Sequence, residues 1–244
     1  MDVIVGYQNS KSNCYFNALL QALGTTRTFR TYLGTHHPLL LKELVLPTFS
    51  QDLLSRLPAP VGQQESASEY LHHLVEFLDK GIPEDQALFN ALLYSHQQTQ
   101  TCLACKNRRV MVDKTTCLLL HENLIELFKT ENTIDGYNCE HCKNKVSLLI
   151  ESQLCGMGSL IIVSLNKYSQ KKKFNYQYGF SVNGVKWELV ATIEHFGTIQ
   201  GGGHYTARIK KGNKYYAIDD EIITELTDLF NDNNTYMLFY ERVN

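Results

Sequence analysis

Cys14 and His204 are the two residues of this sequence best suited to nucleophilic catalysis. A thiolate, not a thiol, attacks a carbonyl carbon, so a catalytic cysteine needs its pKa lowered. A histidine beside it can take the thiol proton and later protonate a leaving amine. Asp219 and Asp220 follow in YYAIDDEII (215–223), and a carboxylate on the second ring nitrogen would fix the tautomer of the imidazole. These residue types predict thiol-dependent cleavage of an amide bond.

The surroundings of Cys14 support this chemistry without establishing it alone. Cys14 opens the helical pattern CYFNALLQAL, and the N–H groups and dipole of a helix N-terminus favour a thiolate. Asn9 lies in the polar stretch QNSKSN, where its amide could donate to a developing oxyanion. Each candidate also has a plain structural explanation. A cysteine packs in a core, a lone histidine lies on a surface or in a satisfied core position, and Asp-Asp forms a solvated turn.

Two C-x-x-C pairs in the middle of the chain predict a metal site. Each pair can bind one ion from a tight turn, and four thiolates satisfy tetrahedral zinc. The expected ligands are Cys102, Cys105, Cys139 and Cys142. His141 lies inside the second pair and is a weaker candidate. The alternative is four reduced thiols without a metal.

The composition is that of an ordinary soluble globular protein. The chain has 244 residues, of which 43% are hydrophobic and 20% charged, with a net charge of −2. This charge gives no general reason to expect nucleic acid, and no apolar run is long enough to span a membrane. The N-terminus lacks a secretory signal, which indicates an intracellular protein. In such a protein, seven cysteines of which four form two C-x-x-C pairs favour metal and catalytic use over disulfides. Cys117 and Cys155, outside the two pairs, are expected to be small buried hydrophobic residues.

Two helices and several strands must position these residues. Apolar periodicity predicts helices over 14–23 and 66–79, the second of which ends before Gly81 and Pro83. The second half of the chain reads as strands separated by Gly, Asn and Asp turns. The predicted strands are 158–165, 187–193, 204–210, 214–218 and 235–241. Helices followed by a mainly antiparallel sheet predict an α+β protein.

Several segments together resemble the ubiquitin-specific protease family. GYQNSKSNCYFNALLQAL (6–23) is similar to the cysteine box of that family, and GGGHYTARIKKGNKYYAIDDEII (201–223) to its histidine box. Between and after the boxes, QQESASEYLHHLVEFL (63–78), LIIVSLNKY (160–168) and TYMLFYERV (235–243) are similar to further family segments. The matches keep the order of the family and cover nearly the whole chain.

The resemblance implies a role for each candidate residue. Cys14 would be the nucleophile and His204 the general base and acid, with Asp219 orienting His204. Asn9 matches the asparagine of the oxyanion hole, and Asp220 a second aspartate that assists near the oxyanion. His195, in IEHFG, matches a family position that is not the catalytic base, so a structural or loop-positioning role is expected.

The resemblance also implies a papain-like fold with the architecture of a right hand, in a single minimal catalytic domain. The thumb would span residues 1–95, the fingers 96–160 and the palm 161–244. The family places a structural zinc at the tip of the fingers. There the binding energy of the metal stabilises a region too thin to bury a core of its own.

The implied substrate is ubiquitin or a ubiquitin-like modifier, cleaved after its C-terminal glycine. Gly201, Gly202 and Gly203 suit a narrow channel for a Gly-Gly tail, and Glu69 matches a glutamate that faces the arginine-bearing tail. Ser66 stands where the family usually has an aspartate. This departure leaves open the same chemistry on another modifier or on a viral polyprotein Gly-Gly site. A non-catalytic ubiquitin-binding module is the third alternative. We expect a monomer that binds neither nucleic acid nor membrane.

Overall fold

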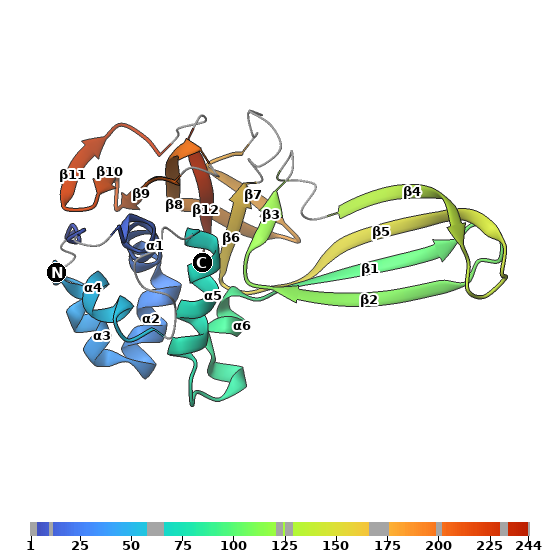
Figure 1. The fold of residues 1–244 in the computed structure, drawn as a ribbon, viewed down its shortest axis with the longest axis horizontal. Helices are drawn as coiled ribbons and strands as arrows, with labels where there is room; N and C mark the ends of the chain where they lie inside the picture. Colours follow the sequence, from blue (N-terminus) through green and yellow to red (C-terminus); the bar gives the residue numbers. More distant parts are fainter. Residues whose placement is uncertain are drawn as a thin grey trace.

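The computed structural model describes residues 4–9, 12–57, 66–120, 124, 129–165, 176–198, 202–229 and 234–243. The helices gather at one end, a large sheet packs over them, and a long small sheet projects away from both (Figure 1). The helices are α1 (Cys14–Thr25), α2 (Arg27–His36), α3 (Pro38–Glu43), α4 (Phe49–Leu54), α5 (Ala67–Leu78), the 3-10 helix η1 (Glu84–Gln86) and α6 (Leu88–Leu92).

Helix α1 is central because it is buried on every side. All its residues from Cys14 to Leu23 are buried, and it contacts β8 and β9 of the large sheet as well as α2, α4 and α5. It ends at Thr25, where the chain turns into α2. The Thr26 side chain accepts a hydrogen bond from the backbone N–H of Phe29 and so caps the new helix.

The large sheet has eight strands, in the order β11-β10-β9-β8-β12-β6-β3, with β7 paired to β8. Its strands are β3 (Leu118–Leu120), β6 (Leu160–Leu165), β7 (Gly179–Val182), β8 (Val185–Thr198), β9 (Gly202–Lys211), β10 (Lys214–Asp219), β11 (Ile222–Leu226) and β12 (Thr235–Arg242). Every residue of β6 is buried. Because side chains alternate along a strand, Ile162 faces the helices and Ile161 faces a second apolar cluster on the other side.

The small sheet is antiparallel, in the order β2-β1-β5-β4. Its strands are β1 (Tyr94–Cys102), β2 (Arg108–Thr115), β4 (Lys129–Asn138) and β5 (Lys145–Met157). Edge strands β2 and β4 are mostly exposed. At the root, Tyr94 is fully buried; its hydroxyl donates to the Leu160 carbonyl and accepts the Ile162 N–H at 2.7 Å. This side chain ties the small sheet to β6.

The α+β class predicted from the sequence is confirmed, and the predicted helices and strands appear within a few residues of their expected ends. Helix 66–79 corresponds to α5, and Gly81, with φ of 82°, lies in the turn that follows. The boundaries of thumb, fingers and palm at residues 95 and 160 stay a prediction. None of the helices in the described part of the chain is long and apolar enough to cross a membrane.

Candidate active site

Cys14 lies at the first position of α1 and is 4% exposed. The backbone N–H groups of Tyr205 and Tyr15 donate hydrogen bonds to its thiol. Burial raises the pKa of Cys14 above its ordinary value, and the Asp220 carboxylate raises it further, against the N–H groups, which lower it. We expected a lowered pKa from the helix N-terminus and a histidine. The structure differs because burial outweighs the N–H groups.

His204 and Asp219 form a close pair on adjacent strands. His204 lies near the start of β9 and Asp219 at the end of β10, and these strands run antiparallel. The distance from His204 Nε2 to Asp219 Oδ1 is 2.5 Å, and the side chains are 40% and 50% exposed. A carboxylate accepts, so the ring proton lies on Nε2 and Nδ1 is left as the acceptor. This is the tautomer that a general base requires.

Asp220 sits at the centre of a second group of hydrogen bonds. The side-chain amides of Asn9 and Asn17 donate to its two carboxylate oxygens at 2.7 Å and 2.6 Å. The oxygen of Asn9 accepts the backbone N–H of Asn13, the N-cap residue of α1, at 3.1 Å. The Asn9 amide is thereby held at both ends close to the start of α1.

The N-terminal segment and the β10–β11 turn pack too closely for any residue but glycine at position 6. A Cβ there would lie 2.6 Å from the Asp220 carbonyl oxygen and 2.5 Å from Glu221 Cα. The Tyr7 N–H donates to the same carbonyl at 2.9 Å. Asp220 itself has φ of 51°, an uncommon backbone conformation that this packing maintains.

Sequence reasoning missed Asn17 and Ser50, both buried beside the site. Asn17 donates to Asp220 and to the carbonyls of Tyr7 and Gln8, and its own oxygen accepts from Ser50 Oγ and from Asn13 at 3.1 Å. A signal was present, since Asn17 lies on a helix whose neighbouring positions are apolar. Its partners, however, are visible only in three dimensions.

The four paired cysteines meet at the far end of the small sheet, in the β1–β2 and β4–β5 turns. Their sulfur atoms all lie within 4.8 Å of one another. The two turns share the sequence C-x-x-C-K-N and the same backbone bonds: Lys106 N–H to Cys102 O and Lys143 N–H to Cys139 O, both 2.9 Å. Both lysines have positive φ, 61° and 59°. The arrangement is a pair of matching turns that aim four sulfurs at one point, where they could hold a metal ion.

A sequence model described as "Ubiquitin carboxyl-terminal hydrolase" matches residues 5–240. The chain belongs to this family. Relatives include ubiquitin carboxyl-terminal hydrolase 36 of Drosophila mojavensis, which is 25% identical over an alignment of 223 positions that covers 74% of this chain and 19% of the relative. Another is ubiquitin carboxyl-terminal hydrolase 23 of Arabidopsis thaliana, 24% identical, with 74% and 26% covered. The chain thus spans about a quarter or less of these two relatives.

Solved structures share the fold of this ubiquitin carboxyl-terminal hydrolase family member. A SAGA DUB module of Ubp8, Sgf11, Sus1 and Sgf73 bound to monoubiquitin matches with a TM-score of 0.77 and 16% identity, covering 99% of this chain and 69% of the other. A yeast SAGA DUB module matches with a TM-score of 0.79 and 15% identity, covering 99% and 69%. The expected fold is therefore confirmed.

The substrate-binding candidates of this family member occupy different settings. Gly201 lies outside the described residues, Gly202 opens β9, and a Cβ on Gly203 would lie 2.2 Å from His195 Nε2. The two histidines differ in their contacts. The ring of His195 packs against Tyr205, with ring centroids 4.5 Å apart, whereas His204 makes the hydrogen bond to Asp219. Glu69 is exposed in the first turn of α5 and makes no side-chain hydrogen bond or ion pair with the described residues.

Asn17→Leu should destabilise the folded protein by about 3 kcal/mol, because it removes the donor to Asp220 Oδ1 and to the Tyr7 carbonyl and also the acceptor of the Ser50 hydroxyl. The free energy of unfolding from urea titration measures this. Gln21→Leu is the matched control on α1. Its amide donates only to the Val5 carbonyl, at 2.5 Å, so its cost should be about 1 kcal/mol. Equal costs for the two variants would contradict a special role for Asn17.

Proposed function

We propose that this protein hydrolyses the peptide or isopeptide bond after the C-terminal glycine of ubiquitin. The observation that carries the proposal is the hydrogen-bonded pair of His204, on β9, and Asp219, on β10. Both strands contact α1, the helix that begins with Cys14. Two structural neighbours of the same fold are described as bound to monoubiquitin and to ubiquitin aldehyde. An aldehyde is a carbonyl electrophile of the kind that a thiolate attacks.

In the proposed reaction, Nδ1 of His204 takes the Cys14 proton while Asp219 stabilises the imidazolium through Nε2–H. The sulfur attacks the carbonyl carbon of the terminal glycine, and the oxyanion accepts from the side-chain amide of Asn9. One hydrogen of that amide goes to Asp220, and the other remains for the oxyanion. His204 then protonates the leaving amine. Water hydrolyses the thioester and regenerates the thiol.

Cys14 alkylation should follow a pH profile with a midpoint above that of an ordinary cysteine, because burial and Asp220 raise its pKa. Only the thiolate reacts with iodoacetamide, so the rate at Cys14 should rise as the pH passes this raised pKa. Asp220→Asn removes a negative charge near the sulfur and should move the profile to lower pH. Peptide mass spectrometry separates Cys14 from the other cysteines.

Glu221→Gln is the control for this experiment, since Glu221 is an exposed neighbour that does not shift the pKa of Cys14. Its profile should match that of the unmodified protein. A profile for Asp220→Asn that stays in place, or moves to higher pH, would contradict the electrostatic role of Asp220.

We also propose that Cys102, Cys105, Cys139 and Cys142 hold one structural zinc. Zinc–sulfur bonds of 2.3 Å in a tetrahedron place sulfurs about 3.8 Å apart. Cys105 Sγ and Cys139 Sγ are 3.9 Å apart, in agreement with that geometry. The Cys105 N–H donates to Cys102 Sγ at 3.5 Å, and this bond is the largest cause that lowers the pKa of Cys102. Burial and the neighbouring sulfurs raise the pKa of Cys105, so the four thiols differ in how easily they ionise before a metal binds.

Glu69 is the proposed partner of an arginine in the modifier tail. Glu69→Ala should lower kcat/KM on a ubiquitin substrate by about 30-fold, or ~2 kcal/mol, because binding would leave the arginine unpaired. The loss should be smaller on a minimal substrate that carries only Gly-Gly. Glu76→Ala, at another exposed glutamate of α5, is the matched control and should change little. Equally small effects of both variants on kcat/KM would show that Glu69 is a solvated helix residue with no role in binding the modifier tail.

A second candidate is the same chemistry on another ubiquitin-like modifier or on a viral polyprotein Gly-Gly site. Ser66 favours it, because this position lacks the acid usual in the family. The Ser66 hydroxyl instead joins those of Ser68 and Tyr236, at 2.7 Å and 2.8 Å. A modifier tail with fewer basic residues would fit this neutral group better.

The deciding experiment treats the protein with C-terminal electrophilic derivatives of ubiquitin and of other Gly-Gly modifiers. Covalent capture of ubiquitin at Cys14, detected by mass spectrometry, would support the proposal. Capture of another modifier alone would support the second candidate. No capture by any derivative, from folded protein with a reactive Cys14, would leave a binding module and overturn the proposal.

A further inference from the structure

The side chain of Asn9 is exposed, so its orientation depends on the few hydrogen bonds that hold it. Its oxygen accepts the backbone N–H of Asn13 at 3.1 Å, and its nitrogen donates to Asp220 Oδ2 at 2.7 Å. It makes no further hydrogen bond with the described residues. Rotation of the Asp220 carboxylate would therefore turn the second N–H of Asn9 away from the position of an oxyanion.

The Asp220 carboxylate is itself oriented by Asn17. Asn17 Nδ2 donates to Asp220 Oδ1 at 2.6 Å, so each carboxylate oxygen accepts one amide N–H. The backbone of Asp220 is held separately, because the Tyr7 N–H donates to its carbonyl at 2.9 Å. The freedom that remains is rotation of the carboxylate about its side-chain bonds. The bond from Asn17, which is 1% exposed, opposes this rotation.

Ser50 and Asn13 set the direction of the Asn17 amide. Ser50 is fully buried on α4, and its hydroxyl donates to Asn17 Oδ1. Asn13 Nδ2 donates to the same oxygen at 3.1 Å. Two donors on this oxygen decide which end of the amide carries the N–H groups, so the nitrogen of Asn17 faces Asp220. The reversed amide would place an oxygen against the carboxylate, which cannot donate.

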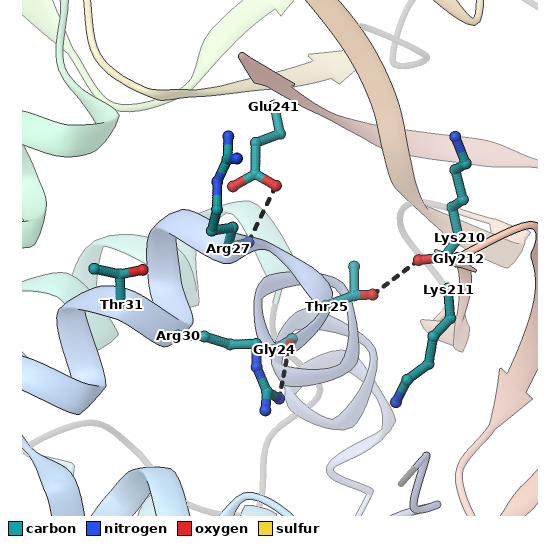
Figure 2. Close-up of a pocket in the computed structure, with 9 residues that line it drawn as sticks. All are labelled: Gly24, Thr25, Arg27, Arg30, Thr31, Lys210, Lys211, Gly212 and Glu241. Carbon is teal, nitrogen blue, oxygen red and sulfur yellow. Dashed lines mark hydrogen bonds between the residues drawn. The ribbon is translucent and has the colours of Figure 1, made fainter. Parts of the chain in front are cut away.

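The helix that carries these asparagines is fixed to the catalytic strand. Asn13 and Asn17 are four positions apart at the start of α1, so they lie on one side of the helix. At the other end of α1, the Thr25 hydroxyl donates to the Lys210 carbonyl at 3.1 Å (Figure 2). Lys210 belongs to β9, the strand of His204. The buried polar group and the catalytic histidine thus share one support.

We propose that Asn17 and Ser50 are positioning residues for the oxyanion step. Both are buried and do not reach a substrate. They act through Asp220 and keep one N–H of Asn9 aimed at the developing oxyanion. A donor that is already in place needs no reorganisation when the charge develops, and a donor that rotates freely loses this advantage. This inference rests on the proposed hydrolysis and extends it to two residues without chemistry of their own.

The test is a set of double-variant cycles on turnover of a fluorogenic ubiquitin amide by the full chain. Asn17→Ala should lower kcat by about tenfold and Ser50→Ala by about threefold, with KM changed by less than about twofold. In the Asn9→Ala background, either substitution should change kcat by less than about twofold, because the donor that they aim is gone. Ser50→Ala removes a single hydroxyl and decides the question if Asn17→Ala unfolds.

Residues that only stabilise the fold would lower kcat by the same factor with and without Asn9, and this result would overturn the proposal. A normal kcat for Asn9→Ala would also overturn it, since Asn9 would then have no role as a donor. Thr192→Val is the matched control, because Thr192 is another fully buried hydroxyl and bonds none of these residues. It should leave kcat unchanged in both backgrounds.

Nuclear magnetic relaxation of the Asn9 side-chain amide tests the positioning role without turnover. Its order parameter should fall in Asn17→Ala and in Ser50→Ala, toward the value of about 0.6 that marks a flexible group. It should stay unchanged in Thr192→Val. Absence of turnover by the unmodified protein would overturn the proposed hydrolysis. An order parameter that does not fall in Ser50→Ala would overturn the positioning role.

Discussion

Cys14→Ala should lower the rate of ubiquitin release from a C-terminal amide substrate by about 10⁴-fold or more, because removal of a nucleophile stops the covalent route entirely. Ubiquitin binding should persist, since the thiol is 4% exposed and adds little to any contact surface. Turnover is measured on a fluorogenic ubiquitin amide, and affinity by calorimetry. Near-normal turnover would show that another residue is the nucleophile.

The two histidines provide an internal comparison for the same experiment. His204→Ala should cause a loss close to that of Cys14→Ala, because Asp219 orients His204 and no other described carboxylate bonds it. His195→Ala should cost much less, since this ring packs on Tyr205 and Gly203. The reverse order would transfer the base role to His195. Cys155→Ala should leave turnover unchanged, because Cys155 lies on the small sheet and is exposed, so the prediction that it is buried is wrong.

Loss of one of the four clustered cysteines, the proposed zinc ligands, is expected to have the second largest effect. Metal analysis of purified protein should find about one zinc per chain. Cys139→Ser should weaken zinc binding by more than about 100-fold. Loss of a residue that only hydrogen-bonds to a metal ligand already lowers metal affinity by about 10–100-fold, and loss of the ligand itself should cost more. The small sheet has no core of its own, so its strands should lose amide protection. Hydrogen exchange of β1, β2, β4 and β5 measures this.

Cys155→Ser is the control, because Cys155 lies on β5 away from the four-sulfur cluster. It should keep zinc content and protection unchanged. Unaltered hydrogen exchange in the small sheet of metal-free protein would contradict the proposal that zinc stabilises this sheet. Exchange in α1 and β9 should remain slow in Cys139→Ser, since these elements belong to the core between the helices and the large sheet.

The sequence predicted the central pair of the site but not its supporting contacts. Cys14 and His204 stand in recognisable segments, and the family resemblance implied that Asp219 orients His204. The bond from Asn17 to Asp220 joins residues 203 positions apart, and no local pattern encodes it. The raised pKa of Cys14 was missed for a related reason. Burial depends on what covers a residue, and the sequence indicated only that Cys14 opens a helix.

The small sheet was also poorly visible in the sequence. A strand can be predicted from alternating apolar and polar residues when one of its faces is buried and the other is exposed to solvent. Strand β2 has exposed side chains at nearly every position, so it has no such alternation. The cysteine pairs located the turns at its tip, whereas the strands between them became evident only from their pairing. Strand β6 lies at the other extreme, since burial on both faces gives the uninterrupted run LIIVSL.

The hydrogen bonds of Tyr94 fix the small sheet to β6 at its root, while the tip with the four sulfurs projects away from the rest of the protein. Strand β1 has nine residues, which at about 3.3 Å each carry the four-sulfur tip roughly 30 Å from Tyr94. The pairing of β1 with β5 shifts register at Ser95 and His96, directly beyond Tyr94, and such an irregularity is where a ribbon bends. A force on the tip would therefore bend the small sheet at Ser95 and His96. Because the bend lies at the root of the small sheet, displacement of the tip should move α1 and β9 little, and Cys14 should keep its position.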